Sequence, residues 1–144
     1  MLELLPIDFT LTALSKTILV IATNMLLGYV WYSPKFFQKQ WLQATLWKEG
    51  AVCDKTSILM SNVGTLFNAF LLNILLIAFD IRKHHFLSAA LAAAILCGFY
   101  TFNGWNYVFF GEKSDYKRRR TLFLIEIGFT FVLYTLVSFI LVGF

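Results

Sequence analysis

The sequence predicts an all-α integral membrane protein: a bundle of four transmembrane helices with a short interfacial amphipathic helix after the first span. Apolar residues make up 59% of the 144 residues, and the mean hydropathy is +0.72, whereas soluble proteins contain roughly 45–50% apolar residues. Four apolar runs are long enough to cross a hydrocarbon core, which takes about 20 residues. Because these runs follow one another through short connections, we expect a single membrane domain over residues 1–144.

The four predicted spans cover residues 6–33, 57–79, 86–110 and 122–144. Pro6 suits the first turn of a helix, and Asp8 suits the positive end of its dipole. Asp54 and Thr56 are candidate caps for the second span. The chain starts with acidic rather than basic residues, so the first run is expected to be a retained helix and not a cleaved signal peptide. No soluble domain is expected outside the membrane.

The exit of the first span is the most distinctive stretch. Trp31 and Tyr32 have amphipathic rings that suit the headgroup level. Pro34 lacks the N–H that a continuing helix needs, and Lys35 and Lys39 follow it. The first helix is therefore predicted to leave the bilayer here.

A short amphipathic helix is predicted over residues 35–49. Phe37, Trp41, Ala44 and Trp47 recur at helical spacing, and Gly50 would end the helix. The pattern suits a helix lying in the interface, and it suits equally a helix lying against its own bundle.

Lysine and arginine are distributed unequally between the two sides of the bundle. The second connection contains two, Arg82 and Lys83. The first and third connections share the other side and contain nine: Lys35, Lys39, Lys48, Lys55, Lys113, Lys117, Arg118, Arg119 and Arg120. The positive-inside rule then predicts that these two basic connections are cytoplasmic and that both termini lie outside.

Polar residues within the spans concentrate towards the basic connections. Counted at 1.5 Å per residue from that side, Asn24 and Asn103 lie about 12 Å deep, with Asn68 slightly deeper and Asn106 and Glu126 at roughly 6–8 Å. These groups could form a polar, aromatic-rimmed cavity open to the cytoplasm, or they could be interhelical hydrogen bonds that fix helix register. The candidate ligand-binding residues are Asn24, Trp31, Tyr32, Asn68, Asn103, Asn106 and Glu126.

Two charges fall inside the spans. Lys16 and Glu126 differ by roughly 17 Å in depth, so an ion pair between them is not expected. Lys16 is expected to extend outward, towards Asp8 or a lipid phosphate. Glu126 could pair with Arg118–Arg120 or take up a proton.

Small residues mark the outer part of the third span, where residues 88–94 read Ser-Ala-Ala-Leu-Ala-Ala-Ala. Small side chains at four-residue spacing let helices approach closely. Tight packing is therefore predicted at this end, within the bundle or between subunits.

Other motifs give weaker indications. The cluster Lys117, Arg118, Arg119 and Arg120 suits positive-inside anchoring, or recognition of anionic lipid headgroups. Nucleic-acid binding is not expected, because no soluble fold presents a groove. Neither a metal site at His84 and His85 nor a disulfide between Cys53 and Cys97 is expected, and no motif for a cofactor or for standard catalysis appears. We therefore predict no catalytic residues and no cofactor.

The stretch from Asn24 to Trp41 resembles a family of small bacterial four-helix membrane proteins, domain of unknown function 1761. The shared pattern comprises Asn24, Gly28, Trp31, Tyr32, Ser33, Pro34, Phe37 and Trp41. Many relatives have glycine where this chain has Gln38. The resemblance covers nearly the whole chain and implies a four-span protein of the bacterial inner membrane, but it implies no activity.

Two functional hypotheses follow. The first is a homo-oligomeric membrane protein that binds or passes a small molecule or lipid through a cytoplasmic-side polar cavity. The asparagines would hydrogen-bond the ligand, the aromatic rings would surround it, and Glu126 would supply a charge or a proton site. The second is an accessory or assembly subunit of a larger membrane complex. An enzyme acting on lipid would rest on Glu126 and the nearby asparagines alone.

Overall fold

The computed structural model describes residues 11–48 and 54–143, and this part of the chain is helical throughout, apart from its turns. The helices are α1 (Leu11–Trp31), α2 (Gln38–Thr45), α3 (Lys55–Ala78), α4 (Phe86–Phe109), the 3-10 helix η2 (Lys113–Asp115) and α5 (Tyr116–Gly143). Four of them are long and apolar enough to cross a membrane. The predicted fold class is thus confirmed, and the chain is a multi-pass membrane protein. Pro6, Asp8, Gly50 and Cys53 lie outside the described residues.

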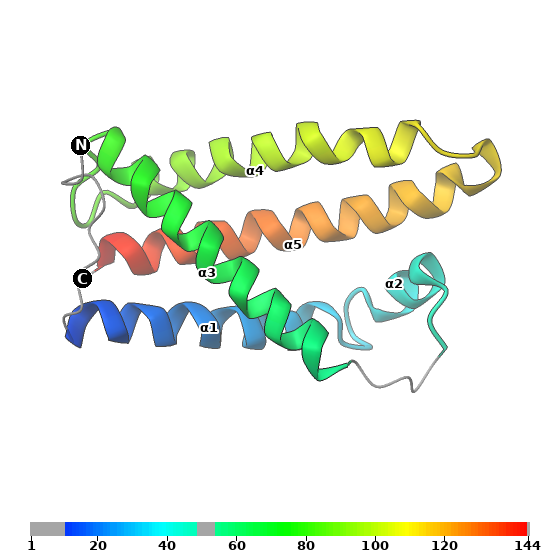
Figure 1. The fold of residues 1–144 in the computed structure, drawn as a ribbon, viewed down its shortest axis with the longest axis horizontal. Helices are drawn as coiled ribbons and strands as arrows, with labels where there is room; N and C mark the ends of the chain where they lie inside the picture. The colour runs from blue at the N-terminus through cyan, green and yellow to red at the C-terminus, as the bar shows by residue number, and fades with distance from the viewer. Residues whose placement is uncertain (1–10, 49–53, 144) are drawn as a thin grey trace.

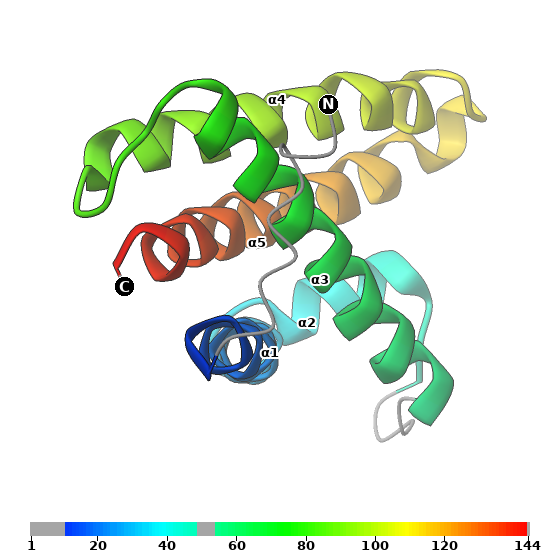
Figure 2. The same ribbon diagram turned by 60° about the vertical axis from the view of Figure 1, so that its left-hand side comes forward.

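Helix α5 is the central element of the bundle. It lies between α1 and α4, while α3 crosses all three at a steep angle (Figures 1 and 2). The short helix α2 lies against the first half of α5. Helix α2 thus packs on its own bundle, as one of the two interpretations of this amphipathic stretch expected.

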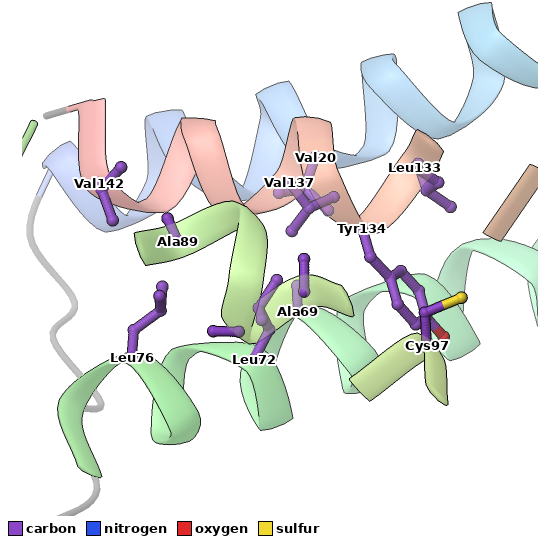
Figure 3. Close-up of a cluster of buried hydrophobic side chains, with 12 residues drawn as sticks. Val20, Ala69, Leu72, Leu76, Ala89, Cys97, Leu133, Tyr134, Val137 and Val142 are labelled. Atoms are coloured by element: carbon purple, nitrogen blue, oxygen red, sulfur yellow. The ribbon is translucent and has the colours of Figure 1, made fainter. Parts of the chain in front are cut away.

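The apolar core lies in the half of the bundle opposite the basic connections. Ala89 and Ala93 of α4 have no exposed surface, and they pack with Leu72 of α3 and with Val137 and Val142 of α5 (Figure 3). Because alanine side chains are small, α4 and α5 can approach closely here. The predicted close packing of the alanine-rich segment is confirmed, and it occurs within one chain.

The end of α3 is closed by backbone hydrogen bonds. Asp80 has a left-handed backbone conformation (φ 51°). Its N–H donates to the Ile77 carbonyl at 3.0 Å, and the Ile81 N–H donates to the Leu76 carbonyl at 2.9 Å. This is the Schellman arrangement, in which two otherwise unpaired carbonyls at a helix end find donors. It turns the chain towards α4.

The end of α1 is closed in a similar way by the segment that contains Pro34. The Tyr32 N–H donates to the Gly28 carbonyl at 3.0 Å, and the Phe37 N–H donates to the Trp31 carbonyl at 3.1 Å. The helix thus stops at Trp31, as Pro34 predicts, and the chain folds back to begin α2.

The last helix is longer than the sequence predicts. Hydropathy places its start at residue 122, but α5 begins at Tyr116 and is 28 residues long, about 42 Å. The additional residues at the start of α5 include the basic cluster. Hydropathy excludes this cluster from a span because it is polar, but lysine and arginine are good helix formers and continue the helix. A span needs about 30 Å, so the first part of α5 is expected to extend beyond the hydrocarbon.

Candidate functional site

Five aromatic rings gather where α1 ends, and we call them the exit cluster: Trp31, Tyr32, Phe37, Trp41 and Phe129. The Trp31 ring centroid lies 4.9 Å from that of Phe37 and 6.2 Å from that of Phe129. The Tyr32 centroid lies 5.6 Å from that of Phe129 and 5.4 Å from that of Trp41. Four of the five come from the exit segment of α1 and the start of α2, and the fifth comes from α5. The cluster therefore joins the exit of α1 to the central helix.

Trp31 makes the closest attachment to α5. Its indole N–H donates to the Ile125 carbonyl at 3.2 Å. Its ring lies over Gly128, where an added Cβ would come within 3.0 Å of Trp31 Cζ2. Because glycine has no side chain, the indole can reach the backbone of α5.

Glu126 lies directly beside this attachment. It follows Ile125 and precedes Phe129 by three residues, so its side chain and the Phe129 ring share a face of α5. Its carboxylate is near enough to the hydroxyl groups of Tyr32 and Tyr100 to act on them electrostatically. The side chain is half-buried. Within residues 11–48 and 54–143 it has no hydrogen-bond or ion-pair partner.

The basic residues that could neutralise Glu126 have other partners. Arg118 donates to both carboxylate oxygens of Asp115, at 3.3 and 3.0 Å, and to the Ala44 carbonyl at 3.0 Å. The predicted pairing of Glu126 with this cluster is therefore not what the structure contains.

Arg119 is buried, and it too binds elsewhere. Its Nη2 donates to the Glu112 carbonyl at 2.8 Å and to the Val108 carbonyl at 3.4 Å. Lys117 and Arg120 are exposed. Of the four residues predicted to contact lipid headgroups, Arg118 and Arg119 thus bind groups within the protein, and Lys117 and Arg120 are exposed.

Asn24 is buried between α1 and α3. Its side-chain nitrogen donates to Asn62 Oδ1 at 3.0 Å and is 3.4 Å from Ser61 Oγ. The Asn62 nitrogen in turn donates to the Ile58 carbonyl at 3.0 Å. This arrangement matches the interhelical hydrogen bond that the sequence left open as the alternative to a ligand site.

The other asparagines do not join Asn24. Asn103 is exposed on α4 and donates to the Phe99 carbonyl of its own helix at 3.0 Å. Asn106 is exposed and Asn68 is half-buried. The sequence placed Asn24 and Asn103 at the same depth in the membrane because each was counted from the end of its own helix. In the structure, the ends of α1 and α4 lie at different heights along the bundle. Trp31 meets α5 at Ile125, whereas Gly104 meets it at Phe123, which places Asn24 and Asn103 roughly 12 Å apart along the bundle.

Lys16 is far from Glu126, as expected. It does not simply extend outward: its ammonium group donates to the Leu141 carbonyl at 2.9 Å, near the end of α5. The last four carbonyls of a helix have no partner within it and carry partial negative charge. Lys16 therefore stabilises the end of a neighbouring helix.

An open hollow of about 510 Å³ lies beside α2, and none of the predicted ligand-binding residues lines it. Its walls are Pro34, Gln38, Lys39, Leu42, Gln43 and Trp47.

Three residues of these sites were not singled out from the sequence: Asn62, Tyr100 and Phe129. Phe129 could have been found from its three-residue spacing from Glu126. Tyr100 and Asn62 could not, because their roles depend on how α4 and α3 are rotated against their neighbours.

Neither the curated proteins nor the solved structures include a match to this chain. A family model does match, over residues 15–142, and its description is "Protein of unknown function (DUF1761)". The chain therefore belongs to the DUF1761 family.

Proposed function

We propose that this membrane protein binds a small molecule or lipid, or passes it through the bilayer, at a site formed by Glu126, Tyr100 and the exit cluster. The distribution of lysine and arginine supports a cytoplasmic position for this end of the bundle, with both termini outside. The family resemblance supports the bacterial inner membrane as the location. The asparagines, which the sequence offered as candidate ligand donors, are peripheral to the site in this proposal.

The observation that carries the proposal is the isolation of the Glu126 carboxylate. Charged side chains within membrane spans are costly, and they usually have a partner inside the protein or mark a functional site. Glu126 is half-buried, and among the described residues no cation or hydrogen-bond donor pairs with it. Phe129 shares its face of α5, and its carboxylate acts electrostatically on the hydroxyl groups of Tyr32 and Tyr100. A charged group among aromatic side chains is the mixed lining that small-molecule sites have. A bound ligand would supply the missing partner.

Native mass spectrometry of the protein released from nanodiscs tests this function. The wild-type chain is expected to retain a defined extra mass, and Glu126→Gln is expected to lose it. Glu112→Gln is the matched control, because Glu112 is an exposed glutamate outside the exit cluster and should leave the extra mass unchanged. A wild-type protein that retains no added mass, or an added mass that survives Glu126→Gln, would refute the proposal.

A second candidate function is that of an accessory or assembly subunit. The exposed aromatic face of α4 favours it. Phe99, Phe102 and Phe110 are 68%, 83% and 87% exposed, and Asn103 and Asn106 are exposed beside them. A helix from another subunit could provide hydrogen-bond partners for these amides. The same mass spectra would then contain a stoichiometric second protein, and a homo-oligomer would appear as a multiple of the chain mass.

A further inference from the structure

We propose that the site at Glu126 recognises an organic cation with apolar substituents. This inference rests on the proposed function above and specifies the chemical class of its ligand. The shared chemistry is a positively charged, poorly hydrated group such as a quaternary ammonium or a phosphonium, either as a free small molecule or as the headgroup of an amine-bearing lipid.

The charge of the site is the first argument. Of the three arginines that precede Glu126 on α5, Arg118 and Arg119 are bound to Asp115, Ala44, Val108 and Glu112, and Arg120 is exposed. Lys16 binds Leu141, fifteen residues further along α5, or about 22 Å from Glu126. Within residues 11–48 and 54–143, no cation pairs with the half-buried Glu126 carboxylate. An anionic ligand would be repelled there, whereas a cation would be attracted.

The aromatic rings are the second argument. The faces of tryptophan, tyrosine and phenylalanine rings attract cations, and aromatic cages are the usual way in which proteins recognise quaternary ammonium groups. Phe129 shares a face of α5 with Glu126, and its ring lies 5.6 Å from that of Tyr32 and 6.2 Å from that of Trp31. Phe129 therefore links the carboxylate to the other two rings, which come from the exit segment of α1.

The attachment of Trp31 is the third argument, because it fixes the position of the rings before a ligand arrives. The bond from the indole N–H to the Ile125 carbonyl uses the only hydrogen-bond donor of that side chain. Its ring is held further by packing over Gly128 and against Phe37. A site built in advance loses less conformational entropy when it binds.

Isothermal titration calorimetry with two ions of equal size and opposite charge tests the inference. Tetraphenylphosphonium is expected to bind the detergent-solubilised wild-type chain saturably, and Glu126→Gln is expected to weaken this binding about tenfold or more. Glu126→Asp keeps the charge and should keep most of the affinity, and Glu112→Gln should leave it unchanged. Tetraphenylborate should show no binding that depends on Glu126.

A second variant covers the case in which Glu126→Gln fails to fold. Phe129→Leu keeps an apolar residue in α5 and removes one ring, so it should weaken tetraphenylphosphonium binding several-fold while Phe102→Leu, on the outer face of α4, should not. Equal binding of tetraphenylphosphonium by wild type and Glu126→Gln would overturn the inference, as would equal weakening by both phenylalanine variants.

The two proposals can fail separately. A retained mass in the nanodisc experiment without any tetraphenylphosphonium binding would uphold the ligand site and overturn its cationic specificity. The absence of both would overturn both. The source of the cation follows from the retained mass itself: an amine-bearing lipid lost on Glu126→Gln identifies a headgroup, and a non-lipid mass identifies a free small molecule.

Discussion

At the scale of single residues, two glycines within transmembrane helices differ in the space around them. Gly128 lies in α5 under the Trp31 ring, whereas nothing lies within 4 Å of a Cβ added at Gly28 in α1. The first glycine is required by a close approach, and the second is free to carry a methyl group.

Gly128→Ala is therefore expected to destabilise the protein by about 1–3 kcal/mol, because the indole must move and its bond to Ile125 is strained or lost. Gly28→Ala should be neutral or stabilising by up to about 1 kcal/mol, because alanine favours the helix. Unfolding in mixed detergent micelles, followed by circular dichroism, measures both. Destabilisation by Gly28→Ala would mean that Gly28 faces another chain or a ligand.

At Asp80, a substitution is expected to raise the free energy of unfolding rather than lower it. Its φ of 51° ends α3 in a conformation that favours glycine, and its ion pair with Arg82, at 3.6 Å, is almost fully exposed. Asp80→Gly is expected to stabilise the protein by about 0.5–1 kcal/mol in the same unfolding measurement. Asp80→Ala serves as the control: it removes the same charge but keeps the Cβ, and it should give no such gain.

At the scale of helices, cations from one element close the ends of others. Lys16 of α1 binds the end of α5, and Arg118 and Arg119 of α5 bind the ends of α2 and α4. None of these three helices has a basic residue in its own last turn. The orphan carbonyls and the negative end of each dipole are thus satisfied across helices. Part of the basic cluster therefore stabilises the ends of neighbouring helices.

Arg118→Met is accordingly expected to release α2 from α5. Hydrogen–deuterium exchange at residues 38–45 should rise, because the Ala44 carbonyl loses its partner and Asp115 loses its ion pair. Arg120→Met removes an exposed arginine from the same cluster and should leave exchange in α2 unchanged. Equal effects of the two variants would show that net charge, and not the contact with Ala44, holds α2 in place.

At the scale of the whole molecule, the hairpin of α4 and α5 extends past the end of α1 (Figure 1). Trp31 meets α5 at Ile125, nine residues after α5 begins at Tyr116, which is about 14 Å. Counted back from Gly143, a span of about 30 Å reaches roughly residue 123 of α5, so we expect the hairpin tip and α2 to lie outside the hydrocarbon. Asn106 would then be in an aqueous or headgroup environment, where an exposed amide costs little.

Cysteine labelling tests this placement together with the proposed orientation. In a variant with Cys53 and Cys97 replaced by alanine, Asn106→Cys should react with a membrane-impermeant maleimide in inverted vesicles and not in intact cells. Leu91→Cys, also exposed on α4 but five residues from its start, should react in neither. Labelling of Asn106→Cys from the outside would reverse the proposed topology, and protection on both sides would place the hairpin tip in the bilayer.

The sequence by itself determined the membrane class, the four spans, the turn at Pro34 and the family, because each follows from local hydrophobicity or a local motif. It also singled out Trp31 and Tyr32, whose rings suit the exit of a span, and Glu126, whose charge is unusual within one. Only the tertiary structure decided which polar residues meet. It paired Asn24 with Asn62, left Asn103 on the outer surface, and gave the arginines partners other than Glu126. Those outcomes depend on the rotation and axial offset of each helix, which are set by packing such as that of Trp31 on Gly128 and Phe123 on Gly104, between residues far apart in the sequence.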